Sequence, residues 1–334
     1  MGGARHWLES LYTSWPATLL EGFRAGLEAR KRDPPRILLG CGMGGSAYSI
    51  AAASLALEEH GYSVIAWRGH KPLRLPGAGV LAVSYSGETL ETIECTRASI
   101  EAGLPALGVA GRGSTLERLL EARGMPVAGL ERRGVPRASL GSLVGAIMGL
   151  VAGGVAARRL SRVASSLDVD GLSAEAEKVA YFLWEALEAE ALPVVVACDP
   201  QGLLTSRWLS ELAENAGVRV VAEAYPGAGH NSIVTWDYPG GRGYFLFIKR
   251  APPGDGFCRA VEGFIEERYR ELGPLHVVDL SRYEVADPLA AALANAIVAG
   301  LASTRLALRL GRDPLETRGI DLYKSKLHGI LKAP

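Results

Sequence analysis

A strand that runs directly into a hydroxyl-rich turn constrains the fold of this chain more than any other stretch. Residues 80–83 form a short apolar run, which predicts a buried parallel strand, and residues 90–100 have the apolar spacing of a helix. The turn between them carries hydroxyls at Ser84, Ser86 and Thr89. Such a turn points backbone N–H groups and the positive end of the helix at one spot, so it predicts an anion-binding site. An ordinary turn with a Ser or Thr cap is the alternative.

Strands and helices alternate in this way along the whole chain. The 334 residues are enough for two domains, and each half ends in a long uncharged helix, over residues 138–157 and 288–304. This alternation predicts mainly parallel sheets covered by helices on both faces, the α/β class. We therefore expect two duplicated α/β units, with strands at residues 36–40, 63–67, 80–83, 104–110, 125–130, 192–198, 218–223, 243–249 and 276–280.

Breaks in the pattern divide the chain into four parts. Asp33-Pro34-Pro35 ends an N-terminal helical segment of residues 1–33. A first α/β domain is expected over residues 34–165 and a second over residues 166–312, with the boundary near Asp168. Residues 313–334 then form a C-terminal tail.

The composition excludes several classes of protein. Lys and Arg number 36 and balance 36 Asp and Glu, whereas a nucleic-acid-binding protein usually has a basic excess. The cysteines, Cys41, Cys95, Cys198 and Cys258, are scattered and have no histidines at ligand spacing, so we expect neither a metal site nor a disulfide framework. No apolar signal segment is present, so we expect a cytoplasmic protein that is not bound to a membrane.

The uncharged run at residues 138–157 is the one stretch that tests this expectation. Its glycines Gly141, Gly145 and Gly149 recur every four residues, as in paired membrane helices. The run is poor in Leu, Ile and Phe, and the rest of the chain is typical of a soluble protein. We therefore expect a helix buried inside a globular protein, whose glycines let another helix, from this chain or a second subunit, come close.

A glycine-rich loop after the first strand is the second candidate ligand site. The four glycines within residues 40–45 approximate a dinucleotide fingerprint. No acidic residue closes the next strand, at residues 63–67, so the ribose anchor of an NAD site is missing and we expect no cofactor. The loop ends in Ser46 at a helix start, where it can hold the polar part of a smaller ligand at the same sheet edge as residues 84–89.

In their joint order these motifs resemble a known family. Gly42-Met43-Gly44-Gly45-Ser46 and the turn at residues 84–89, in a duplicated α/β chain, are similar to the sugar isomerase (SIS) domain. More narrowly, the chain resembles the archaeal bifunctional phosphoglucose/phosphomannose isomerases of the phosphoglucose isomerase superfamily. The likeness extends to Pro136-Arg137, Glu214-Asn215, Gly229-His230-Asn231 and Leu331-Lys332. It implies two SIS-type three-layer α/β/α subdomains and an enzyme that needs no cofactor.

The resemblance also implies a reaction and a role for each motif. The enzyme would interconvert glucose 6-phosphate and mannose 6-phosphate with fructose 6-phosphate. Glu214 would move a proton between C1 and C2 through a cis-enediol, and Arg137 would stabilise the developing charge. The phosphate would be held by Ser84, Ser86 and Thr89, and the sugar would lie beside Gly44, Gly45 and Ser46.

The remaining implied residues lie in a loop and in the tail. His230 would help to open the sugar ring, reaching into the site of the partner subunit of a homodimer. Lys332 would also act in ring opening, from a tail that folds over the site, with Lys324 and Lys326 as alternatives. Ser325 falls where the bifunctional enzymes tend to carry threonine, and its small side chain would leave room for either epimer at C2.

Two other functions fit parts of this pattern. A non-catalytic sugar-phosphate-binding regulator would keep the hydroxyl-rich turn, but it would not need Glu214, His230 and Lys332 together. A glutamine-dependent aminotransferase half is disfavoured, because the chain begins Met1-Gly2-Gly3 without a Cys nucleophile.

Overall fold

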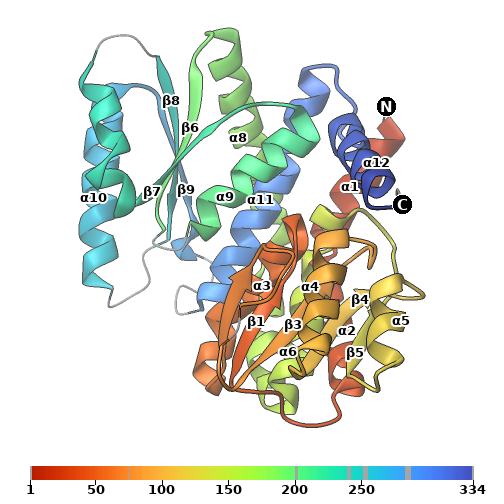
Figure 1. Cartoon of the computed structure of the whole chain (residues 1–334). Coiled ribbons are helices and arrows are strands. Elements are labelled where there is room, and N and C mark those ends of the chain that lie inside the picture. The colour runs from red at the N-terminus through yellow and green to blue at the C-terminus, as the bar shows by residue number, and fades with distance from the viewer. Residues whose placement is uncertain are drawn as a thin grey trace.

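The chain folds into two parallel sheets covered by helices (Figure 1). This computed structural model describes residues 2–73, 75–199, 202–238, 242–250, 255–282 and 287–332. The first sheet contains β1 (Ile37–Cys41), β2 (Ser63–Trp67), β3 (Ala78–Ser84), β4 (Ala106–Gly111) and β5 (Val127–Leu130). The second contains β6 (Leu192–Cys198), β7 (Val221–Tyr225), β8 (Gly243–Lys249) and β9 (Leu275–Asp279).

The two sheets repeat one topology. Their strand orders are β2-β1-β3-β4-β5 and β7-β6-β8-β9, so β6 to β9 occupy the places of β1 to β4. All pairings between neighbouring strands are parallel. Every residue of β3 is buried, as expected for a strand that is covered on both faces. The predicted duplicated α/β fold is confirmed.

Helices cover both faces of each sheet. The N-terminal segment forms α1 (Gly2–Thr13) and α2 (Trp15–Ala29). The first unit adds α3 (Gly44–Leu57), α4 (Leu90–Glu101), α5 (Thr115–Glu121), α6 (Leu140–Val151) and α7 (Ala157–Ser166). The second unit adds α8 (Val169–Glu188), α9 (Leu203–Glu211), α10 (Gly256–Leu272) and α11 (Pro288–Arg309), and the tail forms α12 (Arg318–Lys332).

Glycines bring α2 and α6 into backbone contact. A Cβ on Gly145 of α6 would lie 2.0 Å from the carbonyl oxygen of Leu19, and one on Gly22 of α2 would lie 2.1 Å from that of Ser142. Any side chain at these positions would push the helices apart. The glycine face of α6 is therefore covered by α2 of the same chain, not by a second subunit. The expected single helix over residues 138–157 is also wrong, because α6 ends before Gly153, which has a φ of 69°.

The helix α11 forms the centre of the molecule and runs between the two units (Figure 1). It is long and apolar enough to cross a membrane, yet the whole of its most apolar stretch is buried inside the chain. Within the described ranges, no other helix meets that length and composition. Its apolar character is accounted for by packing against α8, α9 and α3.

Two disulfides correct the expectation that the cysteines form no framework. Cys41, at the end of β1, is bonded to Cys95 on α4, and Cys198, at the end of β6, is bonded to Cys258 on α10. The partners are 54 and 60 residues apart in sequence, so no short motif marks them. Folding brings them together because α4, which follows β3, packs against β1, and α10, which follows β8, packs against β6. The two bonds occupy equivalent places in the two units.

We predict that each disulfide stabilises its unit by restricting the unfolded chain. Cys95→Ala or Cys258→Ala should lower the free energy of unfolding by about 4 kcal/mol, the magnitude expected for closing loops of this length. Urea unfolding of wild type and variants, with and without a thiol reductant, measures the effect. Equal stabilities of wild type and variants under oxidising conditions would contradict it.

Candidate active site

A cavity of about 470 Å³ lies at the carboxyl ends of β1 and β3. Its walls come from three parts of the chain that are distant in sequence. The first unit contributes Met43, Gly44, Gly45, Ser46, residues 84–86 and 88–91, Pro136 and Arg137; the second unit contributes Glu214; and α12 contributes Ile320, Tyr323, Lys324 and Leu327. The structure thus brings together most of the residues that the sequence analysis selected.

The turn after β3 forms a compact cradle of hydroxyls. Ser84 Oγ accepts the N–H of Gly87 at 3.0 Å and donates to Thr89 Oγ1 at 3.1 Å, and Ser86 Oγ lies 3.4 Å from Ser84 Oγ. Gly87 has a φ of 70°, and a Cβ there would overlap the Ser114 side chain, so the turn requires glycine. Because α4 begins at Leu90, its positive end faces this cradle.

The glycine loop after β1 lies beside the cradle, as expected from the parallel sheet. Ser46, in the first turn of α3, accepts the backbone N–H of Tyr85 at 3.3 Å. Gly44 has a φ of 51°, and a Cβ on Gly45 would lie 3.0 Å from the carbonyl oxygen of Pro136. The loop can therefore approach both a ligand and the segment that carries Arg137.

Arg137 and Glu214 meet at the wall of the cavity that faces the second unit. The Arg137 guanidinium is buried, and its Nη1 lies 3.5 Å from Glu214 Oε2. Its Nε donates to Asn215 Oδ1 at 2.6 Å, and its Nη2 donates to the carbonyl of Pro314 at 2.7 Å. Glu214 and Asn215 lie in a π-helical turn, Leu212–Ala216, that continues α9. Such turns occur often at functional sites, because they redirect side chains from a regular helix.

A buried ion pair, missed by the sequence analysis, supports this wall. Arg207 and Glu211 are buried and bonded to each other, and Arg207 Nη2 also donates to the carbonyl of Arg137 at 2.6 Å. Glu211 Oε2 accepts the hydroxyl of Tyr12 at 2.7 Å and the amide of Asn215 at 2.8 Å. Arg207, Glu211 and Asn215 recur every four residues, so they lie on one face of a helix. This spacing is the sequence pattern that could have indicated the network.

Burial shifts the pKa values of two groups in this network toward their neutral forms. Burial raises the pKa of the Tyr12 phenol, which stays neutral and donates to Glu211. Burial also lowers the pKa of the Arg207 guanidinium, and the nearby Glu214 carboxylate acts in the opposite direction. Arg207 is further covered by the ring of Tyr48, whose centroid lies 5.2 Å from the guanidinium carbon.

The tail helix α12 lies over the mouth of the cavity. Tyr323 donates its hydroxyl to Glu91 Oε1 on α4 at 3.0 Å, and Lys324 also lines the cavity. The side chain of Lys332 lies outside the described part of the chain. Ser325 is exposed, donates to the carbonyl of Leu322 at 2.9 Å, and is not among the residues that line the cavity.

His230 lies apart from this cavity. It is exposed in the short helical turn Gly227–His230 after β7, and it is not among the residues that line the cavity. The same loop is anchored further along by Trp236, whose indole N–H donates to the buried Glu223 at 2.9 Å. Tyr269 of α10 also donates to Glu223, which is part of β7, so the carboxylate that accepts Trp236 is itself fixed. The loop is therefore anchored to the second sheet.

The second unit carries aspartates where the first unit has open loops. Asp199 caps α9 by accepting the N–H groups of Leu203 and Thr205, each at 2.9 Å. Asp255 caps α10 by accepting the N–H of Cys258 at 2.8 Å. Among the described residues of the second unit, a carboxylate therefore occupies the anion position at the starts of α9 and α10, whereas the start of α4 carries hydroxyls. Among the described residues, no group of three or more His, Cys, Asp or Glu side chains is placed to hold a metal ion.

Solved structures of low sequence identity share the fold of this chain, and a family model matches its second unit. The fold matches a glucose-6-phosphate isomerase from Chlamydia trachomatis with a TM-score of 0.68 and 16% identity, over 96% of this chain and 74% of that one. It matches the C-terminal domain of a glucosamine-fructose-6-phosphate aminotransferase from Francisella tularensis with a TM-score of 0.66 and 14% identity, over 92% and 97% of the chains. Residues 173–327 match the family model of the bacterial phospho-glucose isomerase C-terminal SIS domain. The chain is therefore an SIS-domain protein.

Sequence relatives narrow the class to a family. A bifunctional phosphoglucose/phosphomannose isomerase from Aeropyrum pernix is 35% identical over 98% of this chain and 99% of its own length. A relative of the same name from Aquifex aeolicus is 25% identical over 92% of this chain and 97% of its own length. The chain belongs to the bifunctional phosphoglucose/phosphomannose isomerase family.

We predict that the buried Arg207–Glu211 pair is a large contributor to stability. Glu211→Ala leaves Arg207 buried without its partner and should lower the free energy of unfolding by about 3–5 kcal/mol. Glu266→Ala, which breaks the solvent-accessible pairs with Arg270 and Lys249, is the control and should cost about 0–1 kcal/mol for each pair. Denaturant unfolding measures both, and equal effects of the two variants would contradict the assignment.

Proposed function

We propose that the chain is an aldose–ketose isomerase that interconverts glucose 6-phosphate and mannose 6-phosphate with fructose 6-phosphate. One observation carries the proposal: the hydroxyl cradle, Arg137 and Glu214 line a single cavity although they come from different units. A regulator that only bound a sugar phosphate would need the cradle but not a carboxylate and a guanidinium facing it.

The cradle suits the phosphate of the substrate. Ser84, Ser86 and Thr89 supply neutral hydroxyls, and the start of α4 adds backbone N–H groups. Neutral donors hold a phosphate reversibly, which a turnover enzyme requires. The reacting carbons would then lie beyond the loop of Gly44, Gly45 and Ser46, toward Arg137 and Glu214.

Glu214 is the carboxylate best placed to move the proton between C1 and C2. Glu88 and Glu91 also line the cavity, but Glu88 accepts the N–H and hydroxyl of Thr115 at 2.9 and 2.8 Å, and Glu91 accepts the hydroxyl of Tyr323. Arg137 is the charged neighbour of Glu214 and would stabilise the oxygen of the enediolate. A cis-enediol has lost the stereochemistry of C2, so one base can serve both aldose epimers.

The tail would supply the ammonium group for ring opening. Lys332 is the residue implied by the family motif, and Lys324 is the alternative that the lining of the cavity supports. Both lie on α12, whose clasp to Glu91 through Tyr323 would keep the tail over the bound sugar. Ser325 is exposed on this helix and does not line the cavity. It would affect the choice between epimers only if α12 moved so that Ser325 faced the bound sugar.

His230 would complete the site of a partner subunit in a homodimer. It is exposed on an anchored loop that does not line the cavity of its own chain. Large apolar side chains are exposed on the same loop and on the adjacent α10, at Val234, Tyr238, Phe257 and Phe264. An apolar surface of this kind beside a functional loop is typical of a subunit interface.

We predict that Glu214→Gln lowers kcat by about 10²–10⁴-fold with a small change in KM, because the variant keeps the shape of the cavity but loses the base. Isomerisation of fructose 6-phosphate and exchange of solvent deuterium into the substrate measure the loss. Glu28→Gln, at an exposed position of α2, is the control. Wild-type exchange by Glu214→Gln would refute the role of this residue.

We predict that Glu214→Gln and His230→Ala complement each other in mixed dimers. A mixed dimer would have one site with both defects and one intact site, so random co-assembly should restore about a quarter of wild-type activity. Co-expression of the two variants and assay of the purified mixture measure this recovery. Activity no higher than the mean of the two separate variants would exclude a shared site.

A further inference from the structure

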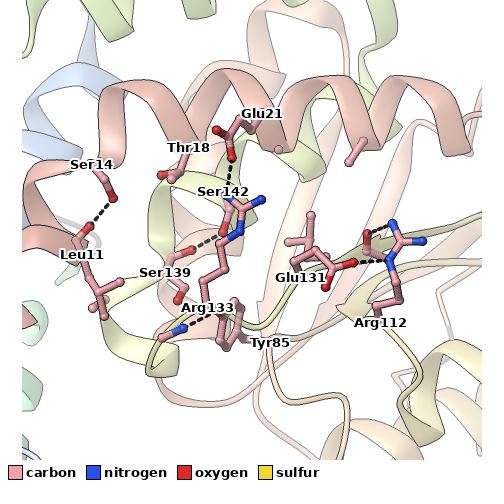
Figure 2. Close-up of a pocket in the computed structure, with 16 residues that line it drawn as sticks. Leu11, Ser14, Thr18, Glu21, Tyr85, Arg112, Glu131, Arg133, Ser139 and Ser142 are labelled. Carbon is pink, nitrogen blue, oxygen red and sulfur yellow. Dashed lines mark hydrogen bonds and ion pairs between the residues drawn. The ribbon is translucent and has the colours of Figure 1, made fainter. Parts of the chain in front are cut away.

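A second cavity, of about 210 Å³, lies on the other side of Tyr85 from the candidate active site. It is enclosed by α2, by the loop after β5, and by the start of α6 (Figure 2). Its polar lining consists of hydroxyls, two arginines and two glutamates. Nothing in the proposed isomerisation uses these groups.

Three serine hydroxyls of this cavity are arranged as acceptors. Ser14 and Ser139 donate their protons to the carbonyls of Leu11 and Val135, at 2.8 and 2.9 Å. Ser142 donates to the carbonyl of Ser139 at 2.9 Å. Since each hydroxyl has one proton, these oxygens offer only lone pairs to a ligand. They match a ligand that carries O–H donors.

The arginines add sites for an anion. Arg133 pairs with Glu21 at 3.1 Å and Arg112 pairs with Glu131 at 2.7 Å (Figure 2). All four side chains are more than half exposed, so each pair contributes only about 0–1 kcal/mol and its carboxylate can turn away at small cost. A guanidinium has five N–H donors, so a phosphate can also bind while the ion pair persists.

We propose that this cavity binds a small polyhydroxylated phosphate monoester, shorter than a hexose phosphate. The phosphate contacts Arg133 and Arg112, and the ligand hydroxyls donate to Ser14, Ser139 and Ser142. The ligand requires both kinds of group: a polyol without a charge leaves the arginines with their glutamates, and a bare phosphate leaves the serine oxygens without donors.

Tyr85 connects the two cavities. The side chain is buried and lines both of them, and its hydroxyl accepts the backbone N–H groups of Arg133 and Gly134 at 2.9 and 3.1 Å. Its own backbone N–H donates to Ser46 in the candidate active site. The segment continues from Gly134 to Arg137, so a ligand on Arg133 acts on the backbone that carries Arg137. Binding at the two sites is therefore linked, a consequence that rests on the proposed function.

Binding is tested with glycerol 3-phosphate on a Ser84→Ala/Thr89→Ala variant, in which the cradle of the active site is disabled. Isothermal titration should show one site, at least about tenfold weaker for glycerol and for inorganic phosphate. Arg133→Gln added to this variant should weaken binding by a similar factor. Arg270→Gln, at an exposed ion-paired arginine of α10, should change it less than twofold. Absence of binding, or binding that is insensitive to Arg133→Gln, overturns the proposal.

Linkage is tested separately in the wild-type chain. With the active site saturated by fructose 6-phosphate, the Kd of glycerol 3-phosphate at the second cavity, measured by isothermal titration, should differ from its Kd without fructose 6-phosphate, and Tyr85→Phe should reduce this difference. An unchanged Kd in wild type refutes the linkage. A chain that binds glycerol 3-phosphate at this cavity but isomerises no sugar phosphate refutes the proposed function and leaves the second site established.

Discussion

The buried pair of Arg207 and Glu211 is the contact on which the rest of the site depends. It joins the N-terminal segment through Tyr12, the first unit through the carbonyl of Arg137, and the second unit through Asn215. A buried charge is stable only when it is paired and hydrogen-bonded. Separating any of these three segments would leave a buried charge without some of its hydrogen-bond partners, which is costly. Arg137 and Glu214 are therefore fixed at the cavity wall.

Duplication explains the architecture, and within the described ranges the two copies differ at the starts of their helices. The first four strands of each unit have the same order, and each unit has an equivalent disulfide between the end of its first strand and the helix after its third strand. In the first unit the helix starts are lined by glycine and hydroxyls and remain open to an anion. In the second they are capped by Asp199 and Asp255. The second unit instead contributes Glu214 and the loop of His230.

Local chemistry made much of this predictable from sequence. The strand, the turn at residues 84–89 and the helix of the cradle lie within about twenty residues, so their geometry follows from turn and helix-start preferences. The parallel sheet then placed Ser46 beside this turn. The resemblance to the SIS family selected Glu214 and Arg137. Arg137 lies 78 residues before Asn215, its hydrogen-bond partner in the second unit, so no local pattern could connect the two segments.

What could not be predicted depends on contacts between distant segments. The glycines of α6 indicated a close helix partner but not that α2 would be it. The cysteines pair across more than fifty residues, and only the packed helices show which ones meet. The burial of Glu211 could not be predicted, because it depends on Tyr12 from the other end of the chain.

The central claim is that the cradle positions a sugar phosphate so that Glu214 reaches its reacting carbons. A crystal structure with a hexitol 6-phosphate, which lacks the carbonyl and cannot react, tests it most directly. The account predicts phosphate oxygens hydrogen-bonded to Ser84, Ser86 and Thr89, with the Glu214 carboxylate about 3–3.5 Å from C1 and C2. A phosphate bound elsewhere, or Glu88 or Glu91 at these carbons in place of Glu214, would contradict it.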